Sequence, residues 1–264
     1  MRQSMPDEEY AGLTASTWDL WRDDTANWSD RFFYRDIIER YGEPVLDIGC
    51  GTGRLLLDYV AEGVDVDGID SSAAMLDICR VKAGQQGCTP GLYQQRLEHL
   101  DLPRRYRTIL GASSVLQLLT EDGAAAGALH RILGHLQPGG AFVTSFAFEW
   151  RPGDPLDTGW ELLFDKPRPS DGATVRAWTR EWREPARQLW HTEQRFEVEI
   201  NGTAVQTEHH QRSPEGRWYS QAQAAELFGA AGYRNIQLFQ GFTHEPARDQ
   251  DPLYCVLGER PATP

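Results

Sequence analysis

Short apolar runs alternate with longer helical patterns between residues 45 and 146. In the last of these patterns, leucine and isoleucine residues between positions 129 and 136 recur at helical spacing, and Pro138-Gly139-Gly140 ends the helix. Such alternation is typical of a parallel sheet covered by helices. The strands that we expect in this part comprise residues 45–48, 64–69, 92–95, 108–112 and 141–146.

The pattern changes after residue 150. Residues 152–169 are rich in proline, glycine and aspartate, and alternating apolar positions then flank Asn201-Gly202, a strong two-residue hairpin turn. Residues 172–213 should therefore form antiparallel strands. A helix with a capping box at Ser220 and Gln223 follows, and two further strands are expected at residues 235–239 and 253–258.

These elements predict an α/β fold: a doubly wound, Rossmann-like, mostly parallel seven-stranded sheet with an antiparallel β insertion. We expect residues 1–41, which combine aromatic and charged positions, to form an N-terminal helical cap. The core should comprise residues 42–149 and 214–264, and the insertion residues 150–213.

Composition narrows the possible partners and location. The 39 acidic and 26 basic residues give a formal charge of -13, which disfavours binding to nucleic acid and to anionic membranes. The sequence has no run of roughly 20 apolar residues, and Met1 to Tyr10 lack the apolar centre of a signal peptide, so we expect a cytoplasmic protein. The four cysteines form no C-x-x-C pair, and neither structural zinc nor another metal is expected.

A glycine-rich turn carries the chemical information. The strand 45–48 runs into Gly49-Cys50-Gly51-Thr52-Gly53, and the next strand ends at Asp70, an acid that is placed to bind two ribose hydroxyls. A dinucleotide-binding turn would have its third glycine where Arg54 stands, and Asp47 would face the diphosphate. The turn therefore favours a nucleoside ligand with a cationic amino group over a dinucleotide.

At these residues the chain resembles the class I S-adenosylmethionine-dependent methyltransferases. The motif from Asp47 to Gly53 is specific, and Leu136-Gln137-Pro138-Gly139-Gly140 matches the turn that precedes the fifth strand of that class. The resemblance covers residues 40–146 and 215–258. It implies S-adenosylmethionine as cofactor, S-adenosylhomocysteine as product, and a lid over the acceptor formed by residues 150–213.

The resemblance also assigns roles to individual residues. The three glycines of the turn pass under the methionyl and ribose groups, Asp47 lies near the methionyl amine, and Asp70 binds the ribose. Ser71 and Met75 pack on the adenine. Because Arg96 stands where many members have an acid, either the backbone around Leu97 or Glu98 contacts the adenine instead. The cofactor-binding residues expected on this basis are Asp47, Gly49, Cys50, Gly51, Gly53, Asp70, Ser71, Met75, Leu97, Ser113 and Ser114.

Candidate acceptor-site residues come from three segments. Glu149 and Trp150 follow the fifth strand, where Glu149 is either a catalytic base or a solvated acid, and Trp150 faces the substrate or anchors the lid. Pairing around the hairpin turn places His209 opposite Gln194, on the face of the insertion that covers the acceptor site. There it is either a catalytic base or a packing residue. Tyr10, Trp28 and Phe33 either close over the cofactor and substrate or pack the cap on the sheet.

We therefore expect an enzyme that methylates an oxygen or nitrogen nucleophile of a small molecule, such as a secondary metabolite. Methyl transfer is an in-line displacement that requires positioning rather than a nucleophilic side chain of the enzyme. The alternatives are a protein methyltransferase, a non-catalytic protein that binds the adenosyl cofactor, and a nicotinamide-dependent oxidoreductase. The motifs leave the acceptor, the methylated atom and the oligomeric state open.

Overall fold

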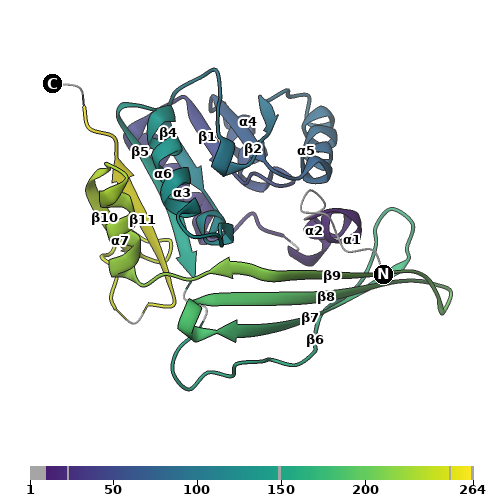
Figure 1. The fold of residues 1–264 in the computed structure, drawn as a ribbon. Helices are drawn as coiled ribbons and strands as arrows, with labels where there is room; N and C mark the ends of the chain where they lie inside the picture. Colours follow the sequence, from purple (N-terminus) through teal and green to yellow (C-terminus); the bar gives the residue numbers. More distant parts are fainter. Residues whose placement is uncertain (1–9, 23, 148–149, 250, 263–264) are drawn as a thin grey trace.

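A computed structural model describes residues 10–22, 24–147, 150–249 and 251–262 of the protein. It contains two sheets, one of seven strands and one of four. Figure 1 shows the smaller sheet beside the larger one, with two short N-terminal helices between them. Within the described part of the chain, no helix combines the length and the apolar character that a membrane span requires.

The seven-stranded sheet has the order β10-β11-β5-β4-β1-β2-β3. The central strands pair in parallel, whereas β11 is antiparallel to both of its neighbours. This arrangement confirms the predicted Rossmann-like sheet. The strands are β1 (Val45–Ile48), β2 (Val66–Asp70), β3 (Leu92–Gln94), β4 (Tyr106–Gly111), β5 (Leu136–Ala147), β10 (Arg234–Gln240) and β11 (Leu253–Glu259).

Helices cover both faces of this sheet and bury one hydrophobic core on each. The helices α3 (Ser29–Tyr41), α4 (Arg54–Ala61) and α5 (Ala73–Gln85) pack on one face. The helices α6 (Ala124–His135) and α7 (Gln221–Ala230) pack on the other, and the capping box at Ser220 begins α7 as expected. The helix α6 ends before Leu136, which is a buried residue of β5 rather than the last position of the helical stripe.

The four-stranded sheet is antiparallel and has the order β6-β7-β8-β9. One of its faces packs on Leu13 of helix α1 (Gly12–Ser16), which is followed by α2 (Trp18–Arg22). We call this sheet the lid sheet. Its strands are β6 (Glu161–Pro167), β7 (Thr174–Glu184), β8 (Leu189–Ile200) and β9 (Thr203–Arg217).

Candidate functional site

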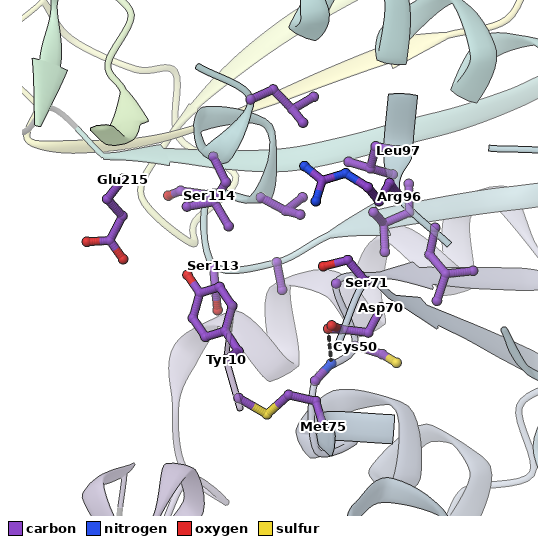
Figure 2. Close-up of a pocket in the computed structure, with 18 of the residues that line it drawn as sticks. Tyr10, Cys50, Asp70, Ser71, Met75, Arg96, Leu97, Ser113, Ser114 and Glu215 are labelled. Atoms are coloured by element: carbon purple, nitrogen blue, oxygen red, sulfur yellow. Dashed lines mark hydrogen bonds between the residues drawn. The ribbon is translucent and has the colours of Figure 1, made fainter. Parts of the chain in front are cut away.

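A cavity of about 640 Å³ lies at the carboxyl ends of β1, β2 and β4. Its walls come from the core, from Tyr10 and the helix α2, and from the lid sheet. In a doubly wound sheet this edge is where ligands bind. The cavity brings together these residues predicted from the sequence: Tyr10, Asp47, Gly49, Cys50, Gly51, Asp70, Ser71, Met75, Leu97, Ser113 and Ser114 (Figure 2).

The glycine turn has a backbone that only glycine adopts readily. Gly49, Gly51 and Gly53 have φ angles of 69°, 55° and 86°. Gly53 does not line the cavity; a Cβ atom there would lie 2.6 Å from Sγ of Cys79, inside the core. Gly53 therefore allows the start of α4 to pack against α5, while Gly49 and Gly51 form the cavity wall.

Asp70 is held by backbone amides at the end of β2. Its Oδ2 accepts a hydrogen bond of 2.9 Å from the N–H of Gly51, and its Oδ1 accepts one of 2.8 Å from the N–H of Ser72. Burial raises the pKa of Asp70, against the effect of these hydrogen bonds. The carboxylate thus fixes the glycine turn and lines the cavity (Figure 2).

Asp47 is a buried acid in the cavity wall. It is 2% exposed, and its Oδ1 has no hydrogen-bond partner among the described residues. Burial raises its pKa to about 7, although the charge of Arg54 opposes the shift. An acid in this state favours a bound cation, because the cation would offset the cost of keeping a carboxylate out of water.

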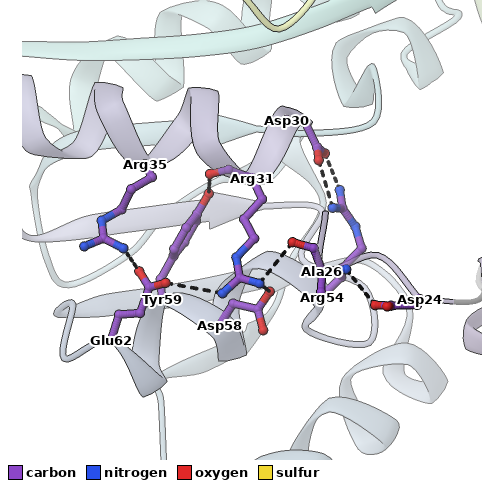
Figure 3. Close-up of polar contacts among 9 residues, drawn as sticks. All are labelled: Asp24, Ala26, Asp30, Arg31, Arg35, Arg54, Asp58, Tyr59 and Glu62. Carbon is purple, nitrogen blue, oxygen red and sulfur yellow. Dashed lines mark hydrogen bonds and ion pairs between the residues drawn. The ribbon is translucent and has the colours of Figure 1, made fainter. Parts of the chain in front are cut away.

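The arginines Arg22 and Arg54 both line the cavity. The guanidinium of Arg54 pairs with both carboxylate oxygens of Asp30 in α3, so its charge is compensated within the protein (Figure 3). Arg22 lies 3.8 Å from the ring centroid of Trp18, and burial, followed by repulsion from Arg54, lowers its pKa to about 10. Arg22 has no ion pair with a described carboxylate, and it is a candidate anion ligand that motif reasoning missed.

Arg96 and Leu97 line the cavity on one side of Asp70, and Met75 lines it on the other (Figure 2). Arg96 forms an ion pair of 3.2 Å with Glu98, so it does not place an uncompensated charge there. Met75 and Leu97 are buried apolar side chains. Met75 and Leu97 therefore offer apolar surfaces that suit a flat aromatic ring. The polar residues Gln95 and Glu98 line the cavity beside Leu97.

One end of the cavity lies between the core and the lid sheet. Ser113 and Ser114 adopt left-handed φ angles of 54° and 57° as the chain leaves β4. Across from them, Glu215 of β9 accepts a hydrogen bond of 2.9 Å from Nε of Arg212 and another from Thr192. Figure 2 shows Glu215, Ser113, Ser114 and Tyr10 around this space.

The position predicted for His209 is wrong. Regular pairing from the Asn201-Gly202 turn would place it opposite Gln194, but a bulge between Val198 and Glu199 shifts the register by one residue. His209 pairs with Arg195 instead and is exposed on the outer face. The covering face carries His210, which is bound to Glu208 at 2.8 Å.

Three of the predicted aromatic residues do not line the cavity. The indole of Trp150 donates to the carbonyl of Asp154, 3.0 Å away, in the loop before the lid sheet. Trp28 is exposed beside Arg54, and Phe33 is buried against Phe239 in the core. These two residues stabilise the packing of α3, which has one buried and one exposed face. Glu149 lies outside the described residues.

Several lid residues that the sequence did not single out line the cavity. The members from β9 follow one shift in the pairing of β8 with β9, at Val198/Glu199, and lie at a second, at Trp190/Thr192. Their only sequence signal is their place before the last helix, which says nothing of the direction of their side chains. These residues are Glu181, Trp190, Arg212, Pro214 and Glu215. Among the described residues, no group of three or more His, Cys, Asp or Glu could hold a metal ion.

Part of the chain is similar in sequence to known methyltransferases. A family profile described as "Methyltransferase domain" matches residues 45–140. A ubiquinone biosynthesis O-methyltransferase of Pectobacterium atrosepticum is 30% identical over 101 residues, which are 38% of this chain. The chain spans only 41% of the length of that relative.

Solved structures match over nearly the whole chain. The CcbJ methyltransferase of Streptomyces caelestis has a TM-score of 0.76 at 21% identity, covering 98% of this chain and 100% of its own. The sugar N-methyltransferase KedS8 of Streptoalloteichus has a TM-score of 0.73 at 19% identity, covering 99% of each chain. Residues 45–140 therefore match a methyltransferase domain, and the chain as a whole has the fold of the solved methyltransferases.

Proposed function

We propose that the protein transfers the methyl group of S-adenosylmethionine to an amine of a small molecule. The observation that carries this proposal is a single cavity that joins the glycine turn and Asp70 to the acidic lid residue Glu215. One end of the cavity fits the cofactor, and the other is open to an acceptor between the core and the lid sheet. The two reactants would meet beside Ser113 and Ser114.

The cofactor end offers a partner for each part of S-adenosylmethionine. Asp70 would bind the ribose hydroxyls, and Met75 with Leu97 would pack on the adenine. The methionyl group is a zwitterion, and Asp47 and Arg22 supply the two complementary charges. The buried carboxylate of Asp47 would attract the methionyl ammonium group, whereas it would repel a diphosphate.

The acceptor end favours a cation. Three carboxylates line it, those of Glu121, Glu181 and Glu215; Arg212 pairs with Glu215 and Arg183 with Glu181, which leaves an excess of one acid. Such a lining attracts an ammonium group. The similarity to a sugar N-methyltransferase extends over the lid sheet and supports the same class of acceptor.

The chemistry requires the amine to be neutral when it attacks. Its nitrogen forms a bond to the methyl carbon while the carbon–sulfur bond breaks, and the electron pair of that bond stays on sulfur. The methylated nitrogen takes the positive charge that sulfur loses, and it then releases a proton to solvent. Glu215 would hold the acceptor amine by a charge-assisted hydrogen bond, with its own carboxylate oriented by Arg212 and Thr192.

Turnover with a panel of acceptors tests the proposal. Release of S-adenosylhomocysteine should be measured with amino sugars, aliphatic amines, catechols and a mixture of peptides. We expect release with at least one class of amine. Release with catechols alone would contradict the amine assignment, release with peptides alone would indicate a protein substrate, and binding of the cofactor without release would indicate a non-catalytic protein.

Replacing Glu215 tests the acceptor end directly. Glu215→Gln keeps the size of the side chain and removes its charge, so kcat/KM for the amine should fall about tenfold, the effect of losing one charge-assisted hydrogen bond. The dissociation constant for S-adenosylhomocysteine should change less than twofold. The matched control is Glu161→Gln, which alters an exposed acid of the lid sheet that does not line the cavity. Equal kinetics for wild type and both variants would remove Glu215 from the acceptor site.

A further inference from the structure

A single buried glutamine joins the lid sheet to the cavity wall. Gln117 belongs to the 3-10 helix η3 (Val115–Leu118), and its side chain is 0% exposed. Its Nε2 donates to the carbonyl oxygens of Ala147 and Arg217, 3.0 and 3.1 Å away. Its Oε1 accepts a hydrogen bond of 2.7 Å from the N–H of Ala147.

The two backbone partners of Gln117 lie at the two chain connections between core and lid. Ala147 is the last residue of β5, after which the chain leaves for the lid sheet. Arg217 is the last residue of β9, through which the chain returns. The side chain of Arg217 adds bonds to the carbonyl of Thr120 at 3.0 Å and to Asp122 at 2.9 Å. Both connections are therefore tied to the segment 113–122.

This same segment forms the reactive end of the cavity. Ser113, Ser114, Leu118 and Glu121 line it on the core side, and Glu215 lies only two residues before Arg217 on the lid side. A shift of the lid about its two connections would change the separation of these walls. Enzymatic rates are sensitive to displacements of about 1 Å at the reacting centre.

The chemistry of the side chain fits this task. A primary amide offers two donors and an acceptor, and all three are used here on two backbone segments. Neither a carboxylate nor an apolar side chain of the same length could make this set of contacts. Because the site is buried, loss of the amide would leave the backbone groups of both connections unpaired.

We propose that Gln117 is a positioning residue that fixes the angle between the lid sheet and the core, and so sets the width of the acceptor end. The expected effect of Gln117 on catalysis rests on the proposed function, whereas its effect on the angle of the lid sheet does not. A measurement of the angle can therefore contradict the role of Gln117 without contradicting the proposed function. Gln117 itself does not line the cavity and acts through the backbone that it holds.

A distance measurement between lid and core tests this role. Cysteines introduced at Val205 of β9 and Val81 of α5, which are 56% and 61% exposed, carry spin labels, with Cys88 replaced by serine. Double electron–electron resonance gives the distribution of distances between the two labels. It is measured in the labelled protein with Gln117 intact, with Gln117→Met and with the control substitution Gln240→Met. Gln240 donates one side-chain hydrogen bond, to Asp251, away from the lid connections.

We expect a broadened or displaced distribution for Gln117→Met, an unchanged one for Gln240→Met, and less than a twofold change in affinity for S-adenosylhomocysteine in both. With an accepted amine, Gln117→Met should lower kcat more than it raises the acceptor KM, because the rate depends on the separation of the reacting groups. A folded Gln117→Met with the wild-type distribution would overturn the proposal, since a purely stabilising role lowers the melting temperature without moving the lid.

The wild type supplies a second test that does not depend on the folding of Gln117→Met. The N–H of Ala147, which is bonded to Gln117, should exchange with solvent as slowly as the amides in the middle of β5. Rapid exchange at Ala147 would show that the contact does not persist and would also overturn the proposal.

Discussion

Replacing Asp70 by alanine should weaken the binding of S-adenosylhomocysteine about a hundredfold. Two hydrogen bonds from ribose hydroxyls to a carboxylate contribute about 1.5 kcal/mol each, or about 3 kcal/mol together, which corresponds to this factor. Asp70 also accepts the N–H of Gly51, so its loss would loosen the turn under the ligand. Calorimetric titration of the purified variant measures the effect.

The matched control for this experiment is Asp77→Ala. Asp77 lies on α5 seven residues further along, is exposed, and pairs with Arg80 at 2.7 Å outside the cavity. We expect it to bind the ligand with wild-type affinity. If Asp70→Ala folds and binds as tightly as Asp77→Ala, then Asp70 does not contact the ligand.

The affinity for S-adenosylhomocysteine should also fall about a hundredfold between pH 8 and pH 5. Burial raises the pKa of Asp47 to about 7, so the free protein carries a neutral Asp47 at pH 5 and a carboxylate at pH 8. Binding the methionyl ammonium requires the carboxylate. Each pH unit below 7 therefore costs about a factor of ten in affinity.

Two controls isolate this titration. Asp47→Asn should bind weakly at every pH and lose the pH dependence. Methylthioadenosine has the nucleoside but no amino acid group, so its affinity for the wild type should not vary with pH. A pH dependence that is the same for methylthioadenosine and S-adenosylhomocysteine would mean that Asp47 does not face the methionyl end.

The stability of the folded protein also depends on the pKa of Asp47. The contribution of Asp47 to stability should fall as the pH rises, whereas the affinity for S-adenosylhomocysteine should increase. The folded pKa of Asp47 lies above its unfolded value of about 4, so the folded state binds the proton more tightly. Stability from this group is present below about pH 4 and is lost as the pH rises towards 7. Asp47→Asn should therefore have a higher melting temperature than the wild type at pH 8, although it binds the ligand less well.

The sequence was sufficient to predict the parts of the site that are formed by residues close to one another in the chain. Residues 45–53 specify a strand and a left-handed glycine turn that leads into the helix α4 at Arg54, and Asp70 ends the neighbouring strand. Because parallel strands bring their carboxyl ends to one edge, these motifs had to converge. The cofactor residues expected from the motifs accordingly line one cavity, apart from Gly53.

The remaining parts depend on contacts between distant segments. One bulge after Val198 exchanges the two faces of β9 relative to the predicted register, so that His209 does not line the cavity. No residue type in the hairpin predicts that bulge. Arg22 reaches the cofactor end only because α2 packs across the turn. Gln117 meets Ala147 and Arg217 across separations of 30 and 100 residues, which no local pattern encodes.

The most direct test of the account is a calorimetric titration of the wild-type protein with S-adenosylhomocysteine and, separately, with NAD and NADP. In the proposed site Asp47 and Arg22 would complement a methionyl zwitterion, and Arg54 occupies the place where a dinucleotide turn has glycine. We predict saturable binding of S-adenosylhomocysteine at a single site and no measurable binding of either dinucleotide. Saturable binding of NAD or NADP, with none for S-adenosylhomocysteine, would contradict the account.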